Sequence, residues 1–223
     1  MRRLALFDLD HTLIPFDSGL AWMRHLRREG VIEAAAEERY LEYCRQYVAG
    51  TLDIHAMVRA ILLPLAAFEP AQVQAWRARF ELEIAAKLPA SMRTLVDAHR
   101  AQGDLCALVT ATERLISEPF ARAFGLEHLV ATEGVMRADG RPTGEIAGLP
   151  CFREHKLTRV QQWLTGLGGA CPASVDGFER SFFYSDSIND LPLLEAVTDP
   201  VAVRPDDALR ARAATVHWPV LDI

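Results

Sequence analysis

Apolar and polar positions follow two different periods along the chain, and together they predict an α/β fold. Short apolar runs bounded by polar residues or glycine are typical of buried strands. Such runs lie at 4–7, 105–109, 182–185, 201–203 and 216–218. Amphipathic stretches typical of helices lie at 91–101, 114–124, 152–165, 190–197 and 206–213. Strand–helix units of this kind need right-handed crossovers, so we expect a Rossmann-like, doubly wound parallel sheet.

A helical block interrupts the alternation after the first strand. Glycine and proline divide it into four stretches expected to be helical, at 17–28, 33–49, 51–63 and 70–87. We therefore expect an α/β core from residues 1–15 and 89–223, and an inserted all-helical cap from residues 16–88. Further short strands are expected at 130–132, 135–137 and 143–146, with a hairpin turn at 138–140.

Two carboxylates stand at the carboxyl end of the first strand. Asp8 and Asp10 are one residue apart and are followed by Thr12. In open α/β sheets, catalytic groups collect beyond the carboxyl ends of the strands. Burying two carboxylates is costly unless a cation or a proton offsets their charge. The pair therefore indicates a hard metal ion, a catalytic role, or both.

Further polar residues follow the other strands and are expected to meet this pair in one crevice. They are Thr110 and Thr112, Lys156 with Arg153 one helical turn before it, and Asp186, Asn189 and Asp190. A hydroxyl and free backbone N–H groups at a strand end can hold phosphate oxygens. A fixed ammonium can neutralise both a phosphate and a carboxylate. Four aspartates with oxygen-only ligands indicate Mg²⁺ rather than zinc.

The order of these motifs resembles the haloacid dehalogenase superfamily, in its phosphoserine-phosphatase-like branch with a helical cap after the first strand. The resemblance covers nearly the whole chain. It implies that Asp8 is a nucleophile that forms an aspartyl-phosphate, and that Asp10 protonates the leaving oxygen and later activates water. It further implies that Thr110 hydrogen-bonds the transferring phosphoryl group and that Lys156 stabilises its charge.

The resemblance also implies a Mg²⁺ site. Its ligands would be the Asp8 and Asp186 side chains and the backbone carbonyl of Asp10. Asp190 would contact the ion through a water or would contact the ligands. Simpler structural roles stay open for several of these residues. Asp190 and Thr112 could each cap a helix, Lys156 could be a solvated helix lysine, and Arg153 could be either an auxiliary cation or a surface residue.

The cap carries the information on substrate. In the family's phosphoserine phosphatases, an acidic residue nine positions after the nucleophile meets the substrate ammonium. Asp17 stands there and could equally be a helix N-cap. Ile61 stands where the family's carboxylate-binding Arg is expected, with Arg59 two positions earlier. The usual Ser-Gly-Gly is Thr110-Ala111-Thr112, so phosphoserine fits less well than an amine-bearing ester without a carboxylate.

Some members of this branch are histidinol-phosphate phosphatases, so histidinol phosphate becomes a candidate. The substrate-binding candidates are Asp17, Thr112, Arg153 and Asn189. Tyr40, Tyr43 and Tyr47 are at helical spacing and could either pack inside the cap or line its pocket.

Composition narrows the remaining function classes. The net charge of −6 and the lack of a Lys/Arg run argue against a nucleic-acid partner. The four scattered cysteines predict free thiols, and no stretch approaches a membrane span, so a cytoplasmic protein is expected. We expect a Mg²⁺-dependent hydrolase of small phosphate monoesters. A phosphotransferase and a non-catalytic phosphate-binding protein are the alternatives, whereas Asp10 and the acidic pair Asp186/Asp190 disfavour a dehalogenase.

Overall fold

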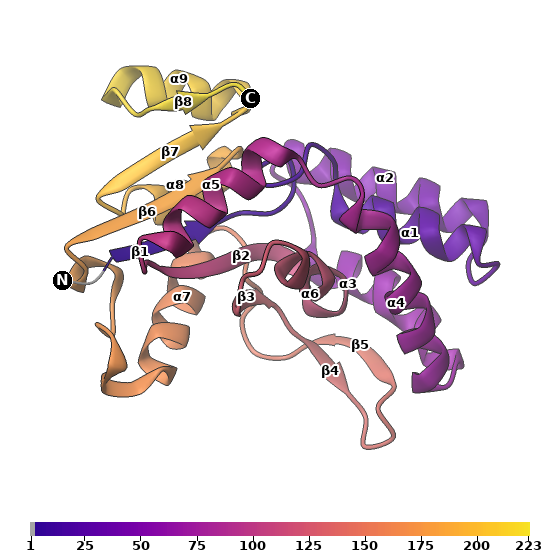
Figure 1. Ribbon diagram of the computed structural model, residues 1–223. Helices are drawn as coiled ribbons and strands as arrows, with labels where there is room; N and C mark the ends of the chain where they lie inside the picture. Colours follow the sequence, from indigo (N-terminus) through magenta and orange to yellow (C-terminus); the bar gives the residue numbers. More distant parts are fainter. Residues whose placement is uncertain (1–2) are drawn as a thin grey trace.

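Six parallel strands form a single sheet in the computed structural model, which describes residues 3–223. The strand order is β3–β2–β1–β6–β7–β8 (Figure 1). Because the chain moves outward from β1 on one side and then returns to place β6 on the other, the strand order reverses between β1 and β6. This arrangement confirms the Rossmann-like parallel sheet. The strands are β1 (Arg3–Phe7), β2 (Leu105–Glu113), β3 (His128–Thr132), β6 (Arg180–Ser185), β7 (Asp199–Val203) and β8 (Val220–Leu221).

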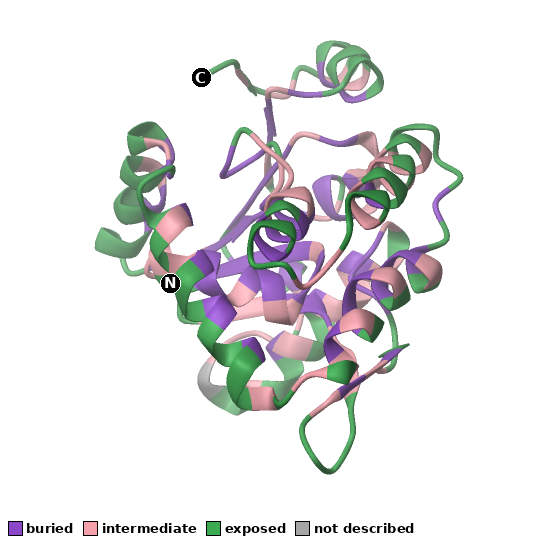
Figure 2. Cartoon of the chain, turned by 90° about the vertical axis from the view of Figure 1, so that its right-hand side faces the viewer, coloured by how far each residue is buried: buried purple, intermediate pink, exposed green. Residues whose placement is uncertain are grey.

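Alternate residues of each strand supply two separate cores, one on each face of the sheet. In β1, Ala5 and Phe7 belong to the core shared with α5, α6 and the cap, whereas Leu4 and Leu6 belong to the core under α7, α8 and α9. The strands are accordingly buried while the outer sides of the helices are exposed (Figure 2). The helices are α5 (Ala90–Ala101), α6 (Arg114–Ala123), α7 (Glu154–Gly166), α8 (Leu191–Leu194) and α9 (Asp207–Val216).

The four cap helices lie beyond the carboxyl ends of the strands, at the right of Figure 1. They are α1 (Ser18–Arg28), α2 (Ala34–Val48), α3 (Ile54–Leu62) and α4 (Pro70–Ala85), with a 3₁₀ turn at Leu63–Ala67. The hairpin of β4 (Gly134–Met136) and β5 (Pro142–Ile146) packs against α3. A core segment thus touches the cap, and the division at residues 16 and 88 stays a prediction.

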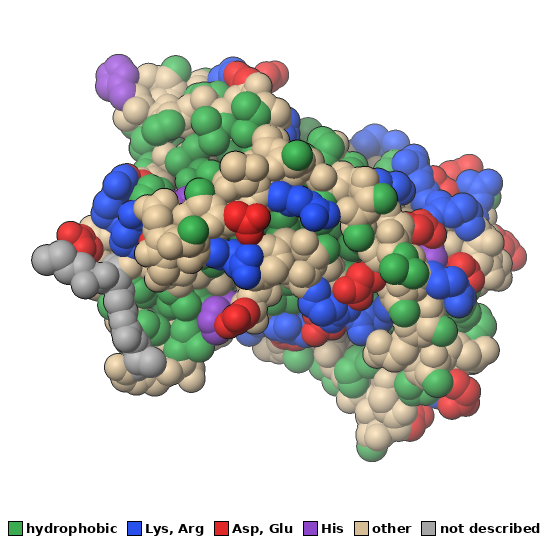
Figure 3. All heavy atoms as spheres, viewed as in Figure 1, with side chains coloured by type: hydrophobic (Ala, Val, Ile, Leu, Met, Phe, Trp, Pro, Cys, Tyr) green, Lys and Arg blue, Asp and Glu red, His purple; other side chains and the backbone are tan. Residues whose placement is uncertain are grey.

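Helix α4 is fixed to α6 by ion pairs. Arg77 donates to the Leu115 carbonyl at 2.8 Å and to Glu118 at 2.5 Å. Arg122 of α6 pairs with Glu81 at 2.6 Å. Positive and negative side chains are intermingled on the face of the molecule shown in Figure 3. Because Arg77 is nearly buried, its contacts hold this side of the cap more firmly than an exposed pair would.

Several boundaries expected from the sequence are wrong, and three of them have a clear local cause. The last strand is Val220–Leu221 rather than 216–218, because α9 continues to Val216 and ends at His217, which adopts a left-handed conformation with φ of 60°. The third cap helix begins at Ile54, because the Asp53 carboxylate caps it by accepting two backbone N–H groups. The helix expected at 190–197 covers only Leu191–Leu194, after a 3₁₀ turn.

All four cysteines are free thiols, as predicted. No single helix within residues 3–223 has the length and apolar character needed to cross a membrane. The segments Ile54–Ala67 and Pro70–Ala85 have that length and apolar character only when they are taken together, and the angle between them is 120°.

Glu113 connects the end of β2 to the β4–β5 hairpin. Its carboxylate accepts hydrogen bonds from the backbone N–H groups of Leu115 at 2.7 Å and Gly134 at 3.2 Å. Burial raises the pKa of Glu113 from 4.5 to about 7. The folded protein therefore binds this proton more tightly than the unfolded chain does.

We expect the free energy of unfolding to fall as the pH rises from about 4.5 to about 7, with Glu113 contributing on the order of 3 kcal/mol of that fall. Glu113→Gln has no carboxyl group to ionise and should show a correspondingly smaller fall. Urea unfolding in EDTA at pH 5 and at pH 8 gives, for each protein, the difference in the free energy of unfolding between the two pH values. Equal differences would show that Glu113 does not titrate in this range.

Candidate active site

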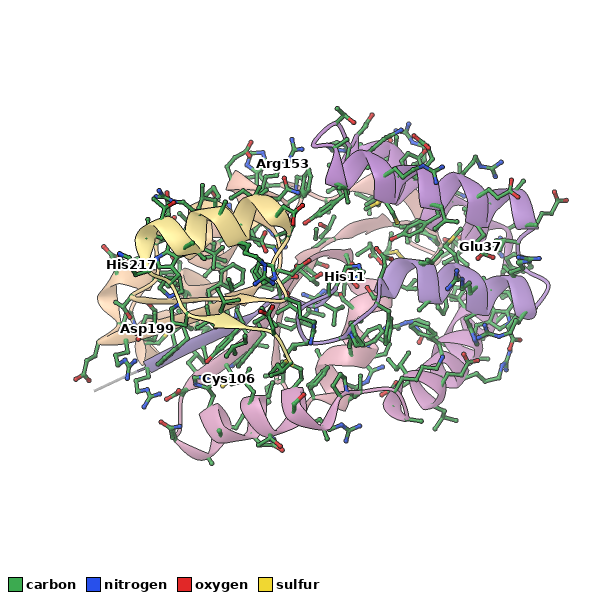
Figure 4. All side chains as sticks on the ribbon, turned by 90° about the horizontal axis from the view of Figure 1, so that it is seen from above. His11, Glu37, Cys106, Arg153, Asp199 and His217 are labelled. Atoms are coloured by element: carbon green, nitrogen blue, oxygen red, sulfur yellow. The ribbon has the colours of Figure 1, made fainter. Side chains whose placement is uncertain are left out.

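Three strand ends bring their polar residues to one cavity. Asp8 follows β1, Thr110 lies in β2 and Asp186 follows β6, and all three line a cavity of about 560 Å³. His11, which also lines it, lies between the core and the cap helices in Figure 4. The cavity thus occupies the edge of the sheet at which the strand order reverses.

Each oxygen of Asp8 has a partner. Lys156 Nζ donates to Oδ1 at 2.8 Å, and the Thr12 hydroxyl lies 3.3 Å from Oδ2. Asp8 is 7% exposed, and burial raises its pKa to about 6 even though Lys156 acts in the opposite direction. The carboxylate is therefore largely ionised at neutral pH and is fixed with its oxygens at the cavity.

Asp10 is held by the start of the cap and the end of β2. The Ser18 N–H donates to Oδ1 at 2.5 Å, and the Thr112 hydroxyl donates to Oδ2 at 2.7 Å. Burial, followed by the charges of Asp17 and Asp8, raises the pKa of Asp10 to about 8. Asp10 therefore keeps its proton at neutral pH, as a general acid must.

Thr112 does not cap α6. Strand β2 continues to Glu113, and it is the Glu113 carboxylate that accepts the N–H group of Leu115 in the first turn of the helix. The capping alternative for Thr112 is therefore wrong. Thr110, two residues earlier, lines the cavity, and its hydroxyl oxygen accepts the Thr112 N–H at 3.1 Å.

Lys156 is buried between two carboxylates. Its ammonium donates to Asp8 at 2.8 Å and to Asp190 at 2.7 Å, and Asp190 also accepts the Ser185 hydroxyl at 2.7 Å. Burial acts to lower the pKa of Lys156, but Asp190 and Asp8 raise it well above its ordinary value. The solvated-lysine alternative is wrong. Asp190 stands at the N-cap position of α8, but its side chain makes no capping bond there and binds Lys156 and Ser185 instead.

Asp186 adds a carboxylate beside Asp8. The Thr12 hydroxyl lies 3.2 Å from Asp186 Oδ1 and 3.3 Å from Asp8 Oδ2, so its single proton can serve only one of them. Burial, followed by the charges of Asp8 and Asp190, raises the pKa of Asp186 well above its ordinary value. The protein alone leaves this pair of carboxylates short of positive charge.

The donor set at this pair fits Mg²⁺. Within residues 3–223, no three carboxylate, imidazole or thiol side chains already converge as a complete metal site. Mg²⁺ does not need one, because it usually keeps several waters and takes only one or two protein carboxylates. Asp8, Asp186 and a backbone carbonyl would meet that requirement with oxygen ligands alone.

Asp17 both caps a helix and faces the cavity. Its carboxylate accepts the Leu20 N–H at 2.6 Å and the Tyr40 hydroxyl at 3.0 Å, and it lines the cavity. The two roles weighed for Asp17 are therefore compatible. Asn189 also lines the cavity, with its backbone N–H bonded to the Ser187 hydroxyl.

The structure places Arg153 outside the cavity, which corrects its expected role in substrate binding. Its guanidinium donates to the Gly50 carbonyl, just beyond the end of α2, at 2.6 Å, and lies over the Phe152 ring. Arg153 precedes α7 and has φ of 51°, a conformation that costs a non-glycine residue on the order of 1–3 kcal/mol. The expectation of a shared helix face with Lys156 fails because Arg153 is not helical.

This conformation gives an expected order of stability. Arg153→Ala loses the contact with Gly50 and keeps the strained backbone, whereas Arg153→Gly loses the contact and removes the strain. We expect Arg153→Gly to be more stable than Arg153→Ala by about 1 kcal/mol in urea unfolding. Glycine normally lowers stability relative to alanine, so the opposite order would show that the backbone is unstrained here.

Sequence reasoning missed three residues that hold the site. Ser18 and Ser185 bond Asp10 and Asp190, and Arg204 donates to the carbonyls of His11 at 3.1 Å and Thr12 at 2.5 Å. Ser185 belongs to the same local cluster as Asp186, but nothing in the sequence assigned it a role. Arg204 is almost two hundred residues from the loop it holds, and nothing in its local sequence indicates the contact.

Known proteins match this chain over most of its length. The family model of the haloacid dehalogenase-like hydrolases matches residues 5–195. A histidinol-phosphatase from Neisseria meningitidis serogroup C is 38% identical over 224 residues, which cover 100% of this chain and 99% of the relative. A crystal structure from Bordetella pertussis Tohama I, described as a protein with unknown function, matches with a TM-score of 0.90 and 45% identity over 100% of this chain and 99% of that one. A substrate-bound phosphoserine phosphatase shares the fold, with a TM-score of 0.67 and 16% identity over 100% of this chain and 94% of the other.

Proposed function

The chain belongs to the haloacid dehalogenase-like hydrolases and is a phosphatase, and from this premise we propose that it acts through a phosphoryl group carried by Asp8 on a small, amine-bearing phosphate monoester. The observation that carries the proposal is the pair Asp8 and Asp10. Lys156 and Thr12 contact Asp8, whereas Ser18 and Thr112 hold Asp10, and both carboxyl groups line the same cavity. Burial raises the pKa of Asp10 to about 8 and that of Asp8 only to about 6, so Asp10 is the better proton donor of the two.

In the first step, an oxygen of Asp8 bonds to phosphorus while the bond from phosphorus to the ester oxygen breaks. Asp10 gives its proton to that leaving oxygen, so the product departs as a neutral alcohol. In the second step Asp10, now ionised, takes a proton from a water that attacks phosphorus. Inorganic phosphate then leaves, and Asp8 is a carboxylate again.

Two groups act directly on the phosphoryl charge, and two more hold one of them in place. The Thr110 hydroxyl at the end of β2 can donate to a phosphoryl oxygen, and Lys156 supplies a positive charge next to Asp8. Asp190 and the Ser185 hydroxyl behind it keep the ammonium in place and charged. Fixed charges of this kind act where the transition state concentrates negative charge.

Mg²⁺ is the cofactor that we propose. Asp8, Asp186 and the backbone carbonyl of Asp10 would hold it. Asp190 would act indirectly, by holding Lys156 next to Asp8. When bound, the ion supplies positive charge to the phosphoryl oxygens.

The charges of the cavity favour an amine-bearing ester over phosphoserine. Among residues 3–223, no lysine or arginine side chain lines the cavity, so a substrate carboxylate would meet no ammonium or guanidinium group. Arg59 is exposed and packs against Gly144, and Ile61 is buried. Asp17 provides a carboxylate for a substrate ammonium. Together with the histidinol-phosphatase relative, this favours histidinol phosphate.

The test is phosphate release from four esters, measured with Mg²⁺ and with EDTA. The esters are histidinol phosphate, phosphoserine, phosphocholine and p-nitrophenyl phosphate. We expect release only with Mg²⁺ and the highest kcat/KM for histidinol phosphate. Phosphoserine as the best substrate would overturn the substrate assignment. Transfer to an added alcohol faster than to water would show a phosphotransferase instead.

A further inference from the structure

One side of the C-terminal half of α2 lines the cavity that holds Asp8 and Asp10. Residues 40, 43, 44, 47 and 48 are spaced by three and four positions, so they share one side of the helix, and all five line the cavity. They are Tyr40, Tyr43, Cys44, Tyr47 and Val48, and we call them the tyrosine face. Only Tyr40 is buried, whereas Tyr43 and Tyr47 are partly exposed and Val48 is 86% exposed at the mouth. Tyr43 and Tyr47 therefore present aromatic surface to the cavity itself.

Acidic side chains line the cavity opposite this face. Its lining includes six aspartates, and within the described residues its only basic side chain is that of His11. Four of the six aspartates are Asp8, Asp10, Asp17 and Asp186. Aromatic rings beside carboxylates attract organic cations through the ring faces and through charge, and they gain nothing from an anionic group.

Tyr40 fixes the carboxylate nearest to the tyrosine face. Its hydroxyl donates to Asp17 at 3.0 Å, and burial together with Asp17 raises the pKa of Tyr40 well above its ordinary value, so the hydroxyl stays a donor. Gly19 makes this approach possible, because a Cβ at that position would lie 1.9 Å from the Tyr40 oxygen. The glycine, the phenol and the carboxylate are thus fitted to one another.

We propose that the tyrosine face determines specificity by selecting a leaving group that carries a positive charge, such as a protonated amine or an imidazolium. This inference rests on the proposed phosphatase function and goes beyond it. Tyr43 and Tyr47 line the cavity with aromatic surface that can contact the cation. Tyr40 is a positioning residue, which holds the Asp17 carboxylate against the same group.

The experiment compares kcat/KM for histidinol phosphate and for n-propyl phosphate, whose leaving group is uncharged. The measured quantity is the ratio of kcat/KM for histidinol phosphate to kcat/KM for n-propyl phosphate. We expect Tyr43→Leu to lower this ratio about tenfold, because ring–cation attraction is lost, and Tyr43→Phe to leave it unchanged. Tyr40→Phe keeps the packing but loses the bond to Asp17, and it should lower the ratio to a similar extent. Gln46→Leu, on the same helix and outside the cavity lining, serves as the control and should behave as wild type.

A second measurement needs no variant. Histidinol should compete with p-nitrophenyl phosphate for the wild-type enzyme at concentrations at least about tenfold below those needed for n-propanol, as cation–ring attraction implies. An unchanged ratio in both Tyr43→Leu and Tyr40→Phe, or equal competition by the two alcohols, would overturn the inference while leaving the phosphatase intact. Hydrolysis of neither ester by wild type would instead contradict the proposed function.

Discussion

Asp8→Asn should abolish phosphate release, with a loss in kcat of about 10⁴-fold or more, as expected when a nucleophile is removed from a site whose groups act together. The asparagine amide has nearly the shape of the carboxylate, and so it can occupy the same place beside Lys156 and Thr12. It cannot form the acyl phosphate. Phosphate release with Mg²⁺ measures the loss directly.

The covalent step can be observed separately. Rapid acid quenching of wild-type enzyme with ³²P-labelled ester should leave label on the protein, and Asp8→Asn should retain none. Asp97→Asn changes an exposed aspartate on α5 and should retain both activity and labelling. Label on the Asp8→Asn protein would contradict the assignment of Asp8 as the nucleophile.

Loss of folding can be distinguished from loss of chemistry in this variant. Burial raises the pKa of Asp8 to about 6, so ionising this carboxyl at neutral pH opposes folding. Asparagine carries no charge, and Lys156 keeps its bond to Asp190. We therefore expect the melting temperature in EDTA at pH 7.5 to be no lower than that of wild type.

The part of the site that sequence alone predicted is the part built from short, local patterns. Asp8 and Asp186 each follow a strand directly, and the parallel arrangement brings all strand ends to one edge of the sheet. Once the strands were assigned, the positions of these groups followed. The same reasoning predicted the sheet and the helical nature of the cap.

The contacts that set the chemistry of Asp10 could not be predicted in this way. Its partners Thr112 and Ser18 come from the end of β2 and the first turn of the cap, and the bond to Thr112 spans 102 residues. Local propensity contains no information on such a contact, and it also hides the extension of β2 that moves Thr112 from a helix cap to the cavity. Arg153 shows the converse error, because helical spacing was applied one residue before the helix begins.

Asp10→Asn should separate esters by the quality of their leaving groups. Alkyl phosphates such as histidinol phosphate need a proton on the departing oxygen, so we expect kcat/KM to fall by about 10²–10⁴-fold. p-Nitrophenolate leaves without a proton, so the rate of the first step with p-nitrophenyl phosphate should fall by less than about tenfold. Stopped-flow release of p-nitrophenol and steady-state release of phosphate measure the two steps.

Asp10→Asn should also slow the second step, the hydrolysis of the aspartyl-phosphate. Water must lose a proton to attack the aspartyl-phosphate, and asparagine cannot accept it, so hydrolysis of the intermediate should become limiting. p-Nitrophenol should then appear as a burst equal to the enzyme concentration, followed by slow turnover. Thr112→Val, which removes a hydrogen bond to Asp10 and keeps the carboxyl, should show a smaller loss and no burst. Equal losses on alkyl and aryl esters would mean that Asp10 orients the substrate or the metal, and that the proton comes from another group.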